Sequence, residues 1–163
     1  QRMEEPGADG ADDVEFLIST NPGESLKPLG RIASGGELSR VMLAIKTVLA
    51  DQDAIETVIF DEIDTGISGR TAQKVSEKLA LIGRSRQVIC ITHLAQLASM
   101  ADSHYCIEKR AVDGSTQTGI RLLDEQESVE ELARILGGAQ ITDAVIDNAR
   151  EMKKLAQKFK AHR

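Results

Sequence analysis

Apolar side chains recur with helical spacing in two segments of the chain. From Glu37 onward one stripe has the spacing of a single helix face and consists of Leu38, Val41, Met42, Ile45 and Val48 or Leu49. A second stripe, between residues 70 and 82, consists of Ala72, Val75, Leu79 and Ile82, and Gly83 follows it as a stop signal. The pattern predicts two amphipathic helices, each burying one face.

Short runs of apolar and β-branched residues lie on either side of the second helix. Residues 57–60 (Thr-Val-Ile-Phe) precede it, and residues 87–92, with Val-Ile-Cys-Ile in the middle, follow it. A strand, a helix and a strand this close together form a βαβ unit, which requires a parallel sheet and a right-handed crossover. Because the strands are continuously apolar, they fit a sheet that is covered on both faces. The fold class is therefore α/β with a parallel βαβ core.

The segment before the first helix is divided by its composition. Residues 1–13 are acidic and contain proline and two glycines, so we expect a linker or a frayed entry there. Residues 14–19 (Val-Glu-Phe-Leu-Ile-Ser) predict a short strand, closed by a turn at residues 21–23 (Asn-Pro-Gly) and followed by a loop. We therefore divide the chain into a linker, 1–13, and one domain, 14–163.

After a short helix at residues 94–101, the pattern changes to that of an antiparallel hairpin. Residues 104–109 and 119–123 flank the turn signal Asp-Gly-Ser at 113–115. This arrangement predicts a β-hairpin at a sheet edge.

Two helices are predicted at the end of the chain. The first has a capping box made by Ser128 and Glu131, and it stops at the glycine pair 137–138. The second runs from about residue 142 to residue 160.

The net charge of −6 is unevenly distributed. From Arg150 to the end the chain carries six basic residues against Glu151 alone, a charge of +5, which leaves 14 basic and 25 acidic residues, or −11, before it. This balance argues against a surface that coats DNA broadly. The basic terminal helix is either exposed to solvent without a partner or in contact with phosphate groups, and the sequence does not decide between these two interpretations.

Other bulk features indicate an ordinary cytoplasmic domain. There is no apolar run long enough to span a membrane and no charged-then-apolar leader, so no membrane partner is expected. Cys90 and Cys106 lie in apolar runs without metal-ligand spacing and are expected to be buried, reduced thiols.

The first candidate for chemistry is the run Ser34-Gly35-Gly36-Glu37 at the start of the first helix. Helix capping accounts for Ser34 as N-cap and for Glu37 as the other half of a capping box. It does not account for two glycines in the first turn, where each costs about 1 kcal/mol relative to alanine. Glycines leave bare N–H groups at the positive end of a helix, an arrangement that suits a phosphate.

The second candidate is the acid pair Asp61-Glu62, directly after the strand at 57–60. Open α/β sheets bind ligands at the carboxyl ends of their strands. Neighbouring residues of a strand point to opposite sides, so one acid can hold a hydrated Mg²⁺ while the other reaches an attacking water. The alternative is a solvated strand end that only feeds a loop.

The third candidate is His93, which ends the other strand of the βαβ unit. In that unit it lies at the same sheet edge as Asp61, although a lone histidine is commonly structural. His104 and His162 have no such neighbours, and we expect no functional role for them.

Other sites are excluded by missing residues. Ser34 lacks the leading glycine of a nucleophile elbow, and no cluster with metal-ligand spacing is present. A phosphate-binding loop of the Gly-x-x-x-x-Gly-Lys type is also excluded, because no glycine in the chain is followed by lysine.

Taken in order, these motifs resemble the C-terminal lobe of the head of an ABC-type ATPase. The resemblance matches Ser34-Gly35-Gly36-Glu37 to the signature motif, residues 57–61 to the Walker B strand, Glu62 to the catalytic carboxylate, residues 64–68 (Asp-Thr-Gly-Ile-Ser) to the D-loop and His93 to the switch histidine. Glu37 stands where transporters have glutamine, which is a departure from their usual signature motif.

Within this class the chain resembles the RecN family of SMC-like bacterial proteins over nearly its whole length. The resemblance is carried by residues 16–24 (Phe-Leu-Ile-Ser-Thr-Asn-Pro-Gly-Glu), 61–69 (Asp-Glu-Ile-Asp-Thr-Gly-Ile-Ser-Gly) and 131–138 (Glu-Leu-Ala-Arg-Ile-Leu-Gly-Gly). Such heads are split into an N-terminal lobe with the phosphate loop, a long coiled coil and a C-terminal lobe. The resemblance implies that residues 1–13 return from the coiled coil and that residues 14–163 form the C-terminal lobe.

The resemblance also implies a ligand and partners. Two heads would sandwich two ATP molecules with Mg²⁺, the metal held by Asp61 through water. Glu62 and His93 would be catalytic, and Ser34, Gly35, Gly36, Glu37 and Asp64 would bind nucleotide. The expected partners are the N-terminal lobe, a second head, and DNA and recombination proteins in double-strand-break repair at the nucleoid.

Two other functions remain open from the sequence. The chain could belong to another SMC-like protein or to the nucleotide-binding domain of an ABC transporter. It could also be a non-enzymatic interaction module, since without a phosphate loop the isolated chain is expected to be inactive.

Overall fold

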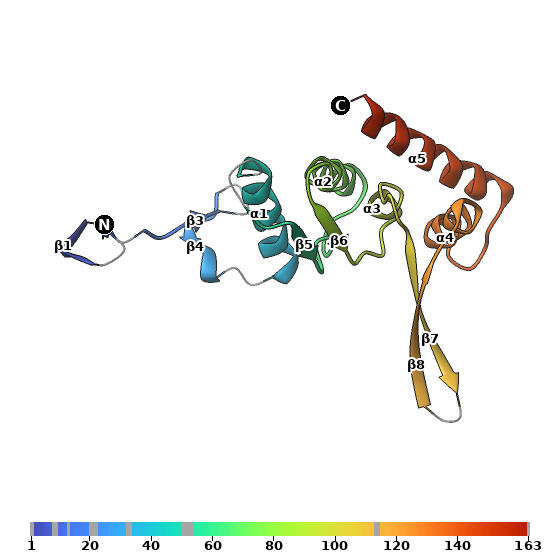
Figure 1. The fold of residues 1–163 in the computed structure, drawn as a ribbon, viewed down its shortest axis with the longest axis horizontal. Coiled ribbons are helices and arrows are strands. Elements are labelled where there is room, and N and C mark those ends of the chain that lie inside the picture. Colours follow the sequence, from blue (N-terminus) through green and yellow to red (C-terminus); the bar gives the residue numbers. More distant parts are fainter. Residues whose placement is uncertain are drawn as a thin grey trace.

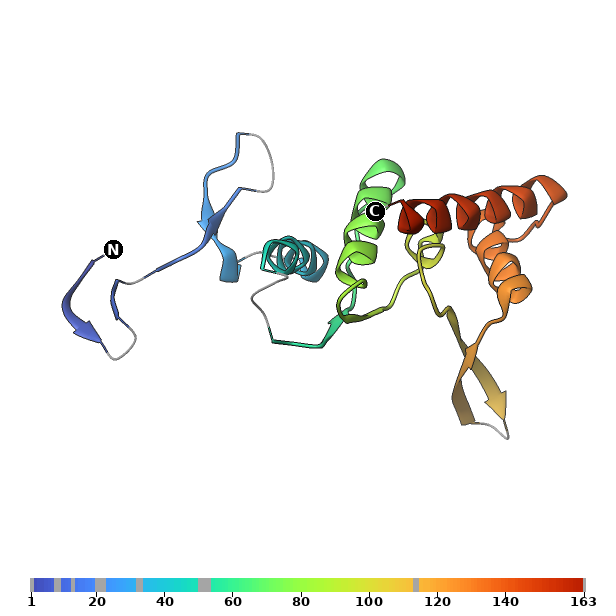
Figure 2. The same cartoon turned by 45° about the horizontal axis from the view of Figure 1, so that its top comes forward.

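The computed structural model describes residues 2–7, 10–12, 14–19, 23–31, 34–49, 54–112 and 115–162. Its elements follow one another along a long axis in about the order of the chain, from β1 (Arg2–Gly7) and β2 (Gly10–Asp12) at one end to α4 (Glu125–Gly137) and α5 (Asp143–Ala161) at the other (Figures 1 and 2). Short parallel and antiparallel strand pairs alternate with helices, so the predicted α/β class is confirmed.

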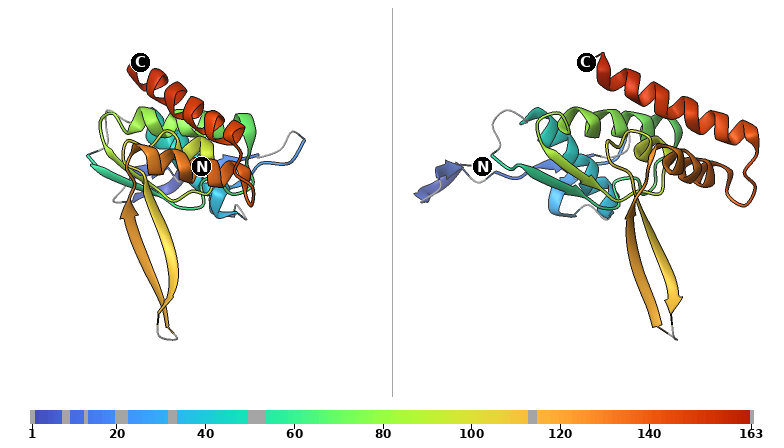
Figure 3. Two further views of the ribbon diagram at one scale, coloured as in Figure 1. Left: turned by 90° about the vertical axis from the view of Figure 1, so that its right-hand side faces the viewer. Right: turned by 45° about the vertical axis from the view of Figure 1, so that its right-hand side comes forward.

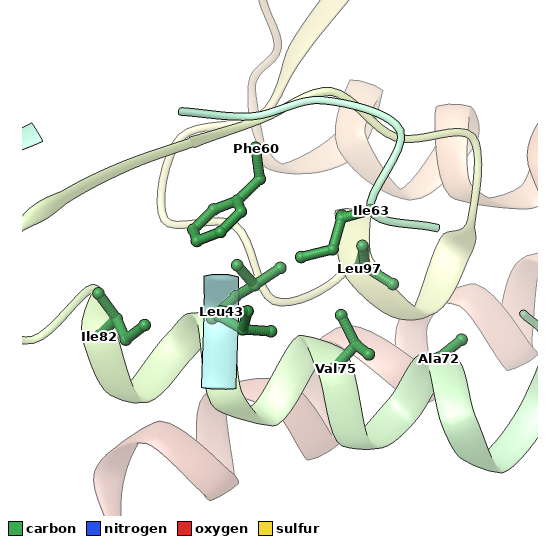
Figure 4. Packing of buried hydrophobic residues seen from close by; sticks show 8 residues of the cluster. Leu43, Phe60, Ile63, Ala72, Val75, Ile82 and Leu97 are labelled. Atoms are coloured by element: carbon green, nitrogen blue, oxygen red, sulfur yellow. The ribbon is translucent and has the colours of Figure 1, made fainter. Parts of the chain in front are cut away.

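The βαβ unit forms the first core of the molecule. β5 (Thr57–Phe60) and β6 (Gln87–Cys90) pair in parallel, in register from Thr57 opposite Gln87 to Phe60 opposite Cys90, and α2 (Gly69–Ile82) connects them. The stripe predicted for α2 is confirmed, since its four apolar side chains are buried. They pack with Phe60 and with Ile63, a fully buried residue beyond the end of β5 (Figure 4).

The sheet is covered on one face within the described residues. Side chains alternate between the faces of a strand. Phe60 points into the core and is 4% exposed, whereas Ile59 is 65% exposed and Ile89 44%. The prediction of a sheet covered on both faces is therefore wrong for this chain taken alone.

The first predicted helix is α1 (Gly35–Val48), but its buried face differs from the predicted one. Leu43 is its one buried large hydrophobic residue, while Leu38, Met42 and Val48, members of the predicted stripe, are exposed. The reason is that α1 meets the βαβ unit through its Gly36 and Leu43 side, so the apolar stripe faces away from that contact.

The C-terminal helices build a second core with α3 (Ala95–Ala98), a short helix after β6. Helix α4 ends at the glycine pair as predicted, with Gly138 at φ 60°, but its capping box is made by Asp124 and Glu127, so the prediction of Ser128 as N-cap is wrong. The observed N-cap precedes the predicted one by four residues, about one helical turn, so both positions lie on the same face of the helix. Ser128 therefore lies inside the helix and is buried.

The predicted hairpin is present as β7 (Tyr105–Val112) and β8 (Ser115–Leu122), which pair with each other and project from the body of the molecule (Figure 3). In the described residues they form a two-stranded sheet of their own, so the expected position at an edge of the βαβ sheet is wrong. Residues 113 and 114 of the predicted turn lie outside the described residues.

Two small antiparallel ribbons precede α1 (Figure 1). β1 and β2 pair where a linker or frayed entry was predicted, so the expectation of fraying is wrong. β3 (Leu17–Ile18) lies within the predicted strand 14–19, and it pairs with β4 (Lys27–Pro28), in a segment predicted as loop. A 3₁₀ turn, η1 (Leu29–Arg31), follows, and residues 21 and 22 of the predicted Asn-Pro-Gly turn are outside the described part.

In the described part of the chain, no helix combines the length and apolar character needed to cross a membrane.

Candidate functional site

The loop that follows β5 carries the acid pair. Asp61 and Glu62 are both exposed, and Asp61 Oδ1 accepts a hydrogen bond from the Glu62 N–H at 2.9 Å. Glu62 has a φ of 56°, a left-handed conformation that is uncommon for a residue with a side chain. The two acids therefore lie in a tight turn beyond the end of β5, and not within a strand as the prediction assumed.

The first turn of α1 packs against this loop. Ser34 caps the helix, its Oγ accepting from the Glu37 N–H at 3.2 Å, as half of the predicted capping box. A Cβ added at Gly36 would lie 2.8 Å from the Glu62 carbonyl oxygen, closer than any real contact allows. Gly36 is thus required by packing within the chain, a reason that the sequence did not reveal.

Gly35 differs from Gly36 in its surroundings. It is exposed, and a Cβ there would meet only the Glu62 carboxylate, with Oε2 at 2.6 Å. That carboxylate is the end of a flexible side chain and can move away. Packing does not demand glycine at this position, so an exposed backbone amide at a helix N-terminus remains a reason for it.

Two further residues of α1 hold the acid loop, and sequence reasoning missed both. Ser39 Oγ donates to the Asp61 carbonyl oxygen at 3.0 Å. Arg40 Nη1 donates to the carbonyl oxygens of Ile63, at 3.2 Å, and Thr65, at 2.8 Å. Ser39 lies three residues and Arg40 four residues after Gly36, so all three share one face of the helix. This spacing is the signal by which the two residues could have been found in the sequence.

Asp64 lies between those two anchored carbonyls and is 3% exposed. Its Oδ2 accepts from Thr92 Oγ1 at 2.6 Å and from the His93 N–H at 2.9 Å, and His93 Nδ1 lies 3.1 Å away. The His93 side chain itself is 76% exposed. The loop after β5 and the loop after β6 are thus joined by one buried carboxylate.

The common sheet edge predicted for the acids and the histidine is present. β5 and β6 run in parallel, and the Ile91 N–H donates to the Phe60 carbonyl oxygen at 3.0 Å, just beyond the strand pairs. The residues that follow, Asp61 and His93, therefore emerge at the same carboxyl edge. Asp61, Glu62, Ser34, Gly35 and Gly36 are grouped around one loop, and His93 is tied to that loop through Asp64.

The last residue of β6, Cys90, is a half-buried thiol near this edge. Burial, followed by the charges of Asp64 and Asp61, raises the pKa of the Cys90 thiol to about 12. A thiol with a raised pKa carries little thiolate near neutral pH, so it is a poor nucleophile there.

The donor set at the edge suits magnesium better than a protein-enclosed metal. Among the described residues, no three or more histidine, cysteine or acidic side chains are gathered in a way that could hold an ion. Magnesium is commonly held by one or two carboxylates, with waters and substrate phosphates completing its shell. The exposed carboxylate of Asp61 fits that mode of binding.

His104, for which no functional role was predicted, has a structural partner. Its Nδ1 lies 2.8 Å from Ser128 Oγ, and burial lowers the pKa of its imidazole below the ordinary value.

Comparison with known proteins gives close relatives along nearly the whole chain, although no family model matches it. It is 49% identical over 153 residues to the DNA repair protein RecN of Halalkalibacterium halodurans, covering 94% of this chain and 27% of that protein. The DNA repair protein RecN of Bacillus subtilis is 50% identical over 151 residues, and that of Deinococcus radiodurans is 48% identical over 150 residues. The chain spans 26% of the length of each of these two.

A solved chain described by the words "Structural biochemistry of ATP-driven dimerization and DNA stimulated activation of SMC ATPases" is also similar. Its TM-score is 0.48 and its sequence identity 22%, covering 74% of this chain and 79% of that chain. This likeness is weak, and the assignment rests on the sequence relatives. With about half of its residues identical to theirs, the chain belongs to the RecN family and corresponds to about a quarter of the length of these relatives.

Proposed function

We propose that this chain is the C-terminal lobe of an ATP-hydrolysing head in a RecN-like protein of DNA double-strand-break repair and recombination. The observation that carries the proposal is the common sheet edge. There an exposed acid pair and an exposed histidine follow two parallel strands, and a glycine-bearing helix start packs against the same loop. The family's members are DNA repair proteins by name, which supports the biological setting.

Each residue has a defined task in this proposal. Asp61 holds Mg²⁺ through water, and the ion supplies positive charge to the phosphates when bound. Glu62 accepts a proton from the attacking water, and its exposed carboxylate at the end of a fixed turn suits a general base. His93 presents its exposed imidazole to the nucleotide on the same head. Ser34, Gly35 and Glu37 meet the nucleotide held by a second head, with Gly36 allowing the helix start to approach the acid loop.

A half-site explains why apolar surface is exposed. The outer face of the β5–β6 sheet carries exposed isoleucines 59, 89 and 91, and Leu38, Met42 and Val48 of the predicted α1 stripe are exposed as well. These surfaces are expected if another part of a longer protein covers them, such as an N-terminal lobe with the phosphate loop. Residues 1–13 would then connect the lobe to a coiled coil. Head engagement with ATP, contacts with DNA and recombination proteins, and a location at the nucleoid complete the proposal.

The proposal is tested with Glu62→Gln in the full-length protein that contains this segment. We expect the variant to lose ATP turnover and to keep ATP-bound dimers, because the amide cannot accept the proton while the fold is unchanged. Asp147→Asn, which alters an exposed acid on α5, is a matched control and should behave like the parent. Turnover at the parent rate in Glu62→Gln would refute the assignment of the general base.

A second experiment tests the half-site itself. The isolated chain should hydrolyse no ATP, and addition of the N-terminal lobe should restore turnover. Robust turnover by the chain alone would contradict the proposal. An interaction module that never uses ATP would instead leave the reconstituted pair inactive.

A further inference from the structure

We propose that Asp64 is a positioning residue that fixes the imidazole of His93, a role that rests on the proposed function of His93 at the nucleotide. The sequence suggested direct contact between Asp64 and nucleotide. The structure gives the carboxylate a different environment from that of its neighbours, since its side chain is 2% exposed while Asp61 and Glu62 are exposed.

Three groups of the histidine loop converge on one oxygen of Asp64. Oδ2 accepts from the Thr92 hydroxyl at 2.6 Å and from the His93 backbone at 2.9 Å, and the His93 Nδ1 lies 3.1 Å from it. Thr92 Oγ1 also accepts from the Leu94 N–H at 3.0 Å, which ties the next residue to the same cluster. Hydrogen bonds to a charged group are stronger than those between neutral groups, so the cluster is sufficient to order a short loop.

The close approach of Nδ1 also bears on the state of the imidazole. A carboxylate oxygen can only accept a hydrogen bond, so its position 3.1 Å from Nδ1 favours the forms of the ring that carry a hydrogen on that nitrogen. The ring belongs to a side chain that is 76% exposed, while the backbone of the same residue is held by a hydrogen bond to Oδ2. Asp64 therefore holds the backbone of His93 and favours a hydrogen on its Nδ1.

The carboxylate can act in this way because its own backbone is held in place. Arg40 of α1 donates to the carbonyl oxygens on both sides of Asp64, those of Ile63 and Thr65. The Ile67 N–H donates to the Asp64 carbonyl oxygen at 3.3 Å. The loop after β5 is thus held by these backbone hydrogen bonds, and Asp64 in turn positions the loop after β6 that carries His93.

The test uses the full-length protein and compares Asp64→Ala with Asp64→Asn. Alanine removes the acceptor, so we expect turnover to fall roughly 10- to 100-fold, the usual effect of misplacing a reacting group. Asparagine keeps an oxygen for the same donors and should retain most of the activity. If Asp64→Asn is as inactive as Asp64→Ala, the carboxylate acts through its charge on the nucleotide or metal, and the inference is overturned.

A double-variant cycle separates positioning from a general effect on the fold. If Asp64 acts through His93, Asp64→Ala combined with His93→Ala should turn over at the rate of His93→Ala alone. Effects that multiply would overturn the inference. Should Asp64→Ala not fold, Thr92→Val removes one arm of the cluster and should lower turnover, whereas Thr92→Ser keeps the hydroxyl and should not. Equal rates for these two would also overturn it.

A spectroscopic readout tests the inference without nucleotide. In protein labelled with ¹⁵N-histidine, the His93 signals, assigned by their loss in His93→Ala, should show hydrogen on Nδ1 in the parent and in Asp64→Asn, but not in Asp64→Ala. An unchanged tautomer in Asp64→Ala would overturn the inference. Failure of the proposed function appears separately, as parent-rate turnover in Glu62→Gln, and it would leave this readout unaffected.

Discussion

The two glycines at the start of α1 should respond differently to alanine, although they are neighbours. At Gly36 a Cβ would lie 2.8 Å from the Glu62 carbonyl oxygen, 3.0 Å from Thr65 Cβ and 3.1 Å from Arg40 Nη1. At Gly35 it would meet only the Glu62 carboxylate, at 2.6 Å from Oε2. The first set includes backbone and an anchored guanidinium, whereas the second is the tip of an exposed side chain.

The change in the free energy of unfolding for each substitution follows from two opposing effects. Replacing glycine by alanine in a helix stabilises by up to about 1 kcal/mol, and overpacking destabilises by about 1–3 kcal/mol. Gly35→Ala escapes the second effect when the Glu62 side chain rotates, so it should leave the free energy of unfolding unchanged or raise it by up to about 1 kcal/mol. Gly36→Ala cannot escape it, and we expect a net loss of about 1–2 kcal/mol.

Urea denaturation of the two variants and the parent measures this difference. For a chain of this size, a loss of 1 kcal/mol lowers the melting temperature by roughly 2–4 °C. Gly119→Ala is a control, since a Cβ at that position in β8 meets nothing within 4 Å. If Gly36→Ala and Gly35→Ala unfold at the same midpoint, the close approach of α1 to the acid loop is not a constraint, and the reasoning is refuted.

Three further outcomes are expected. Arg40→Met removes both hydrogen bonds to Ile63 and Thr65 and should lower the unfolding free energy by about 1–3 kcal/mol, whereas a parent-like urea midpoint would contradict the anchoring role. Burial lowers the pKa of His104 below 6.5, so the contribution of its neutral form to stability is present above that pH and is lost as the pH falls. His104→Gln should therefore flatten the decline of melting temperature on acidification, and an equal decline in the variant and the parent would contradict this role of His104. With a pKa of about 12, Cys90 should react with iodoacetamide near neutral pH only after unfolding, and rapid labelling of the folded chain would be inconsistent with its burial.

The elements that could be predicted from the sequence are those fixed by local physics. The stripe of α2 packs against Phe60 of β5 within the βαβ unit, so the pattern and the structure agree on this face, whereas Ile59 and Ile89 on the outer face of the same strands are exposed. The common edge of Asp61 and His93 followed from the parallel pairing alone. Edge position is a topological property, and it does not depend on side-chain detail.

The parts that the sequence missed depend on contacts between distant segments. Arg40 has the polar character of a solvated helix residue, yet it binds carbonyl oxygens more than twenty positions away. Ser128 and Glu131 match the spacing of a capping box as well as Asp124 and Glu127 do. The structure distinguishes them by burial: Ser128 is buried, 2.8 Å from His104 Nδ1, whereas Asp124 is exposed at the start of the helix. Local spacing cannot rank two such matches.

The mismatch between pattern and burial in α1 is informative in a different way. Leu38 and Met42 are placed as if for a core, yet they are 43% and 39% exposed, and Ile59 on the outer sheet face is 65% exposed. Two exposed apolar faces in one domain are typical of surfaces that another part of a protein covers. The chain corresponds to about a quarter of the length of its relatives, and such surfaces fit the burial that the rest of a longer protein would provide. The hydrophobic pattern therefore fits the assembled head that we propose, in which a second lobe would pack on the apolar surfaces that are exposed in this chain.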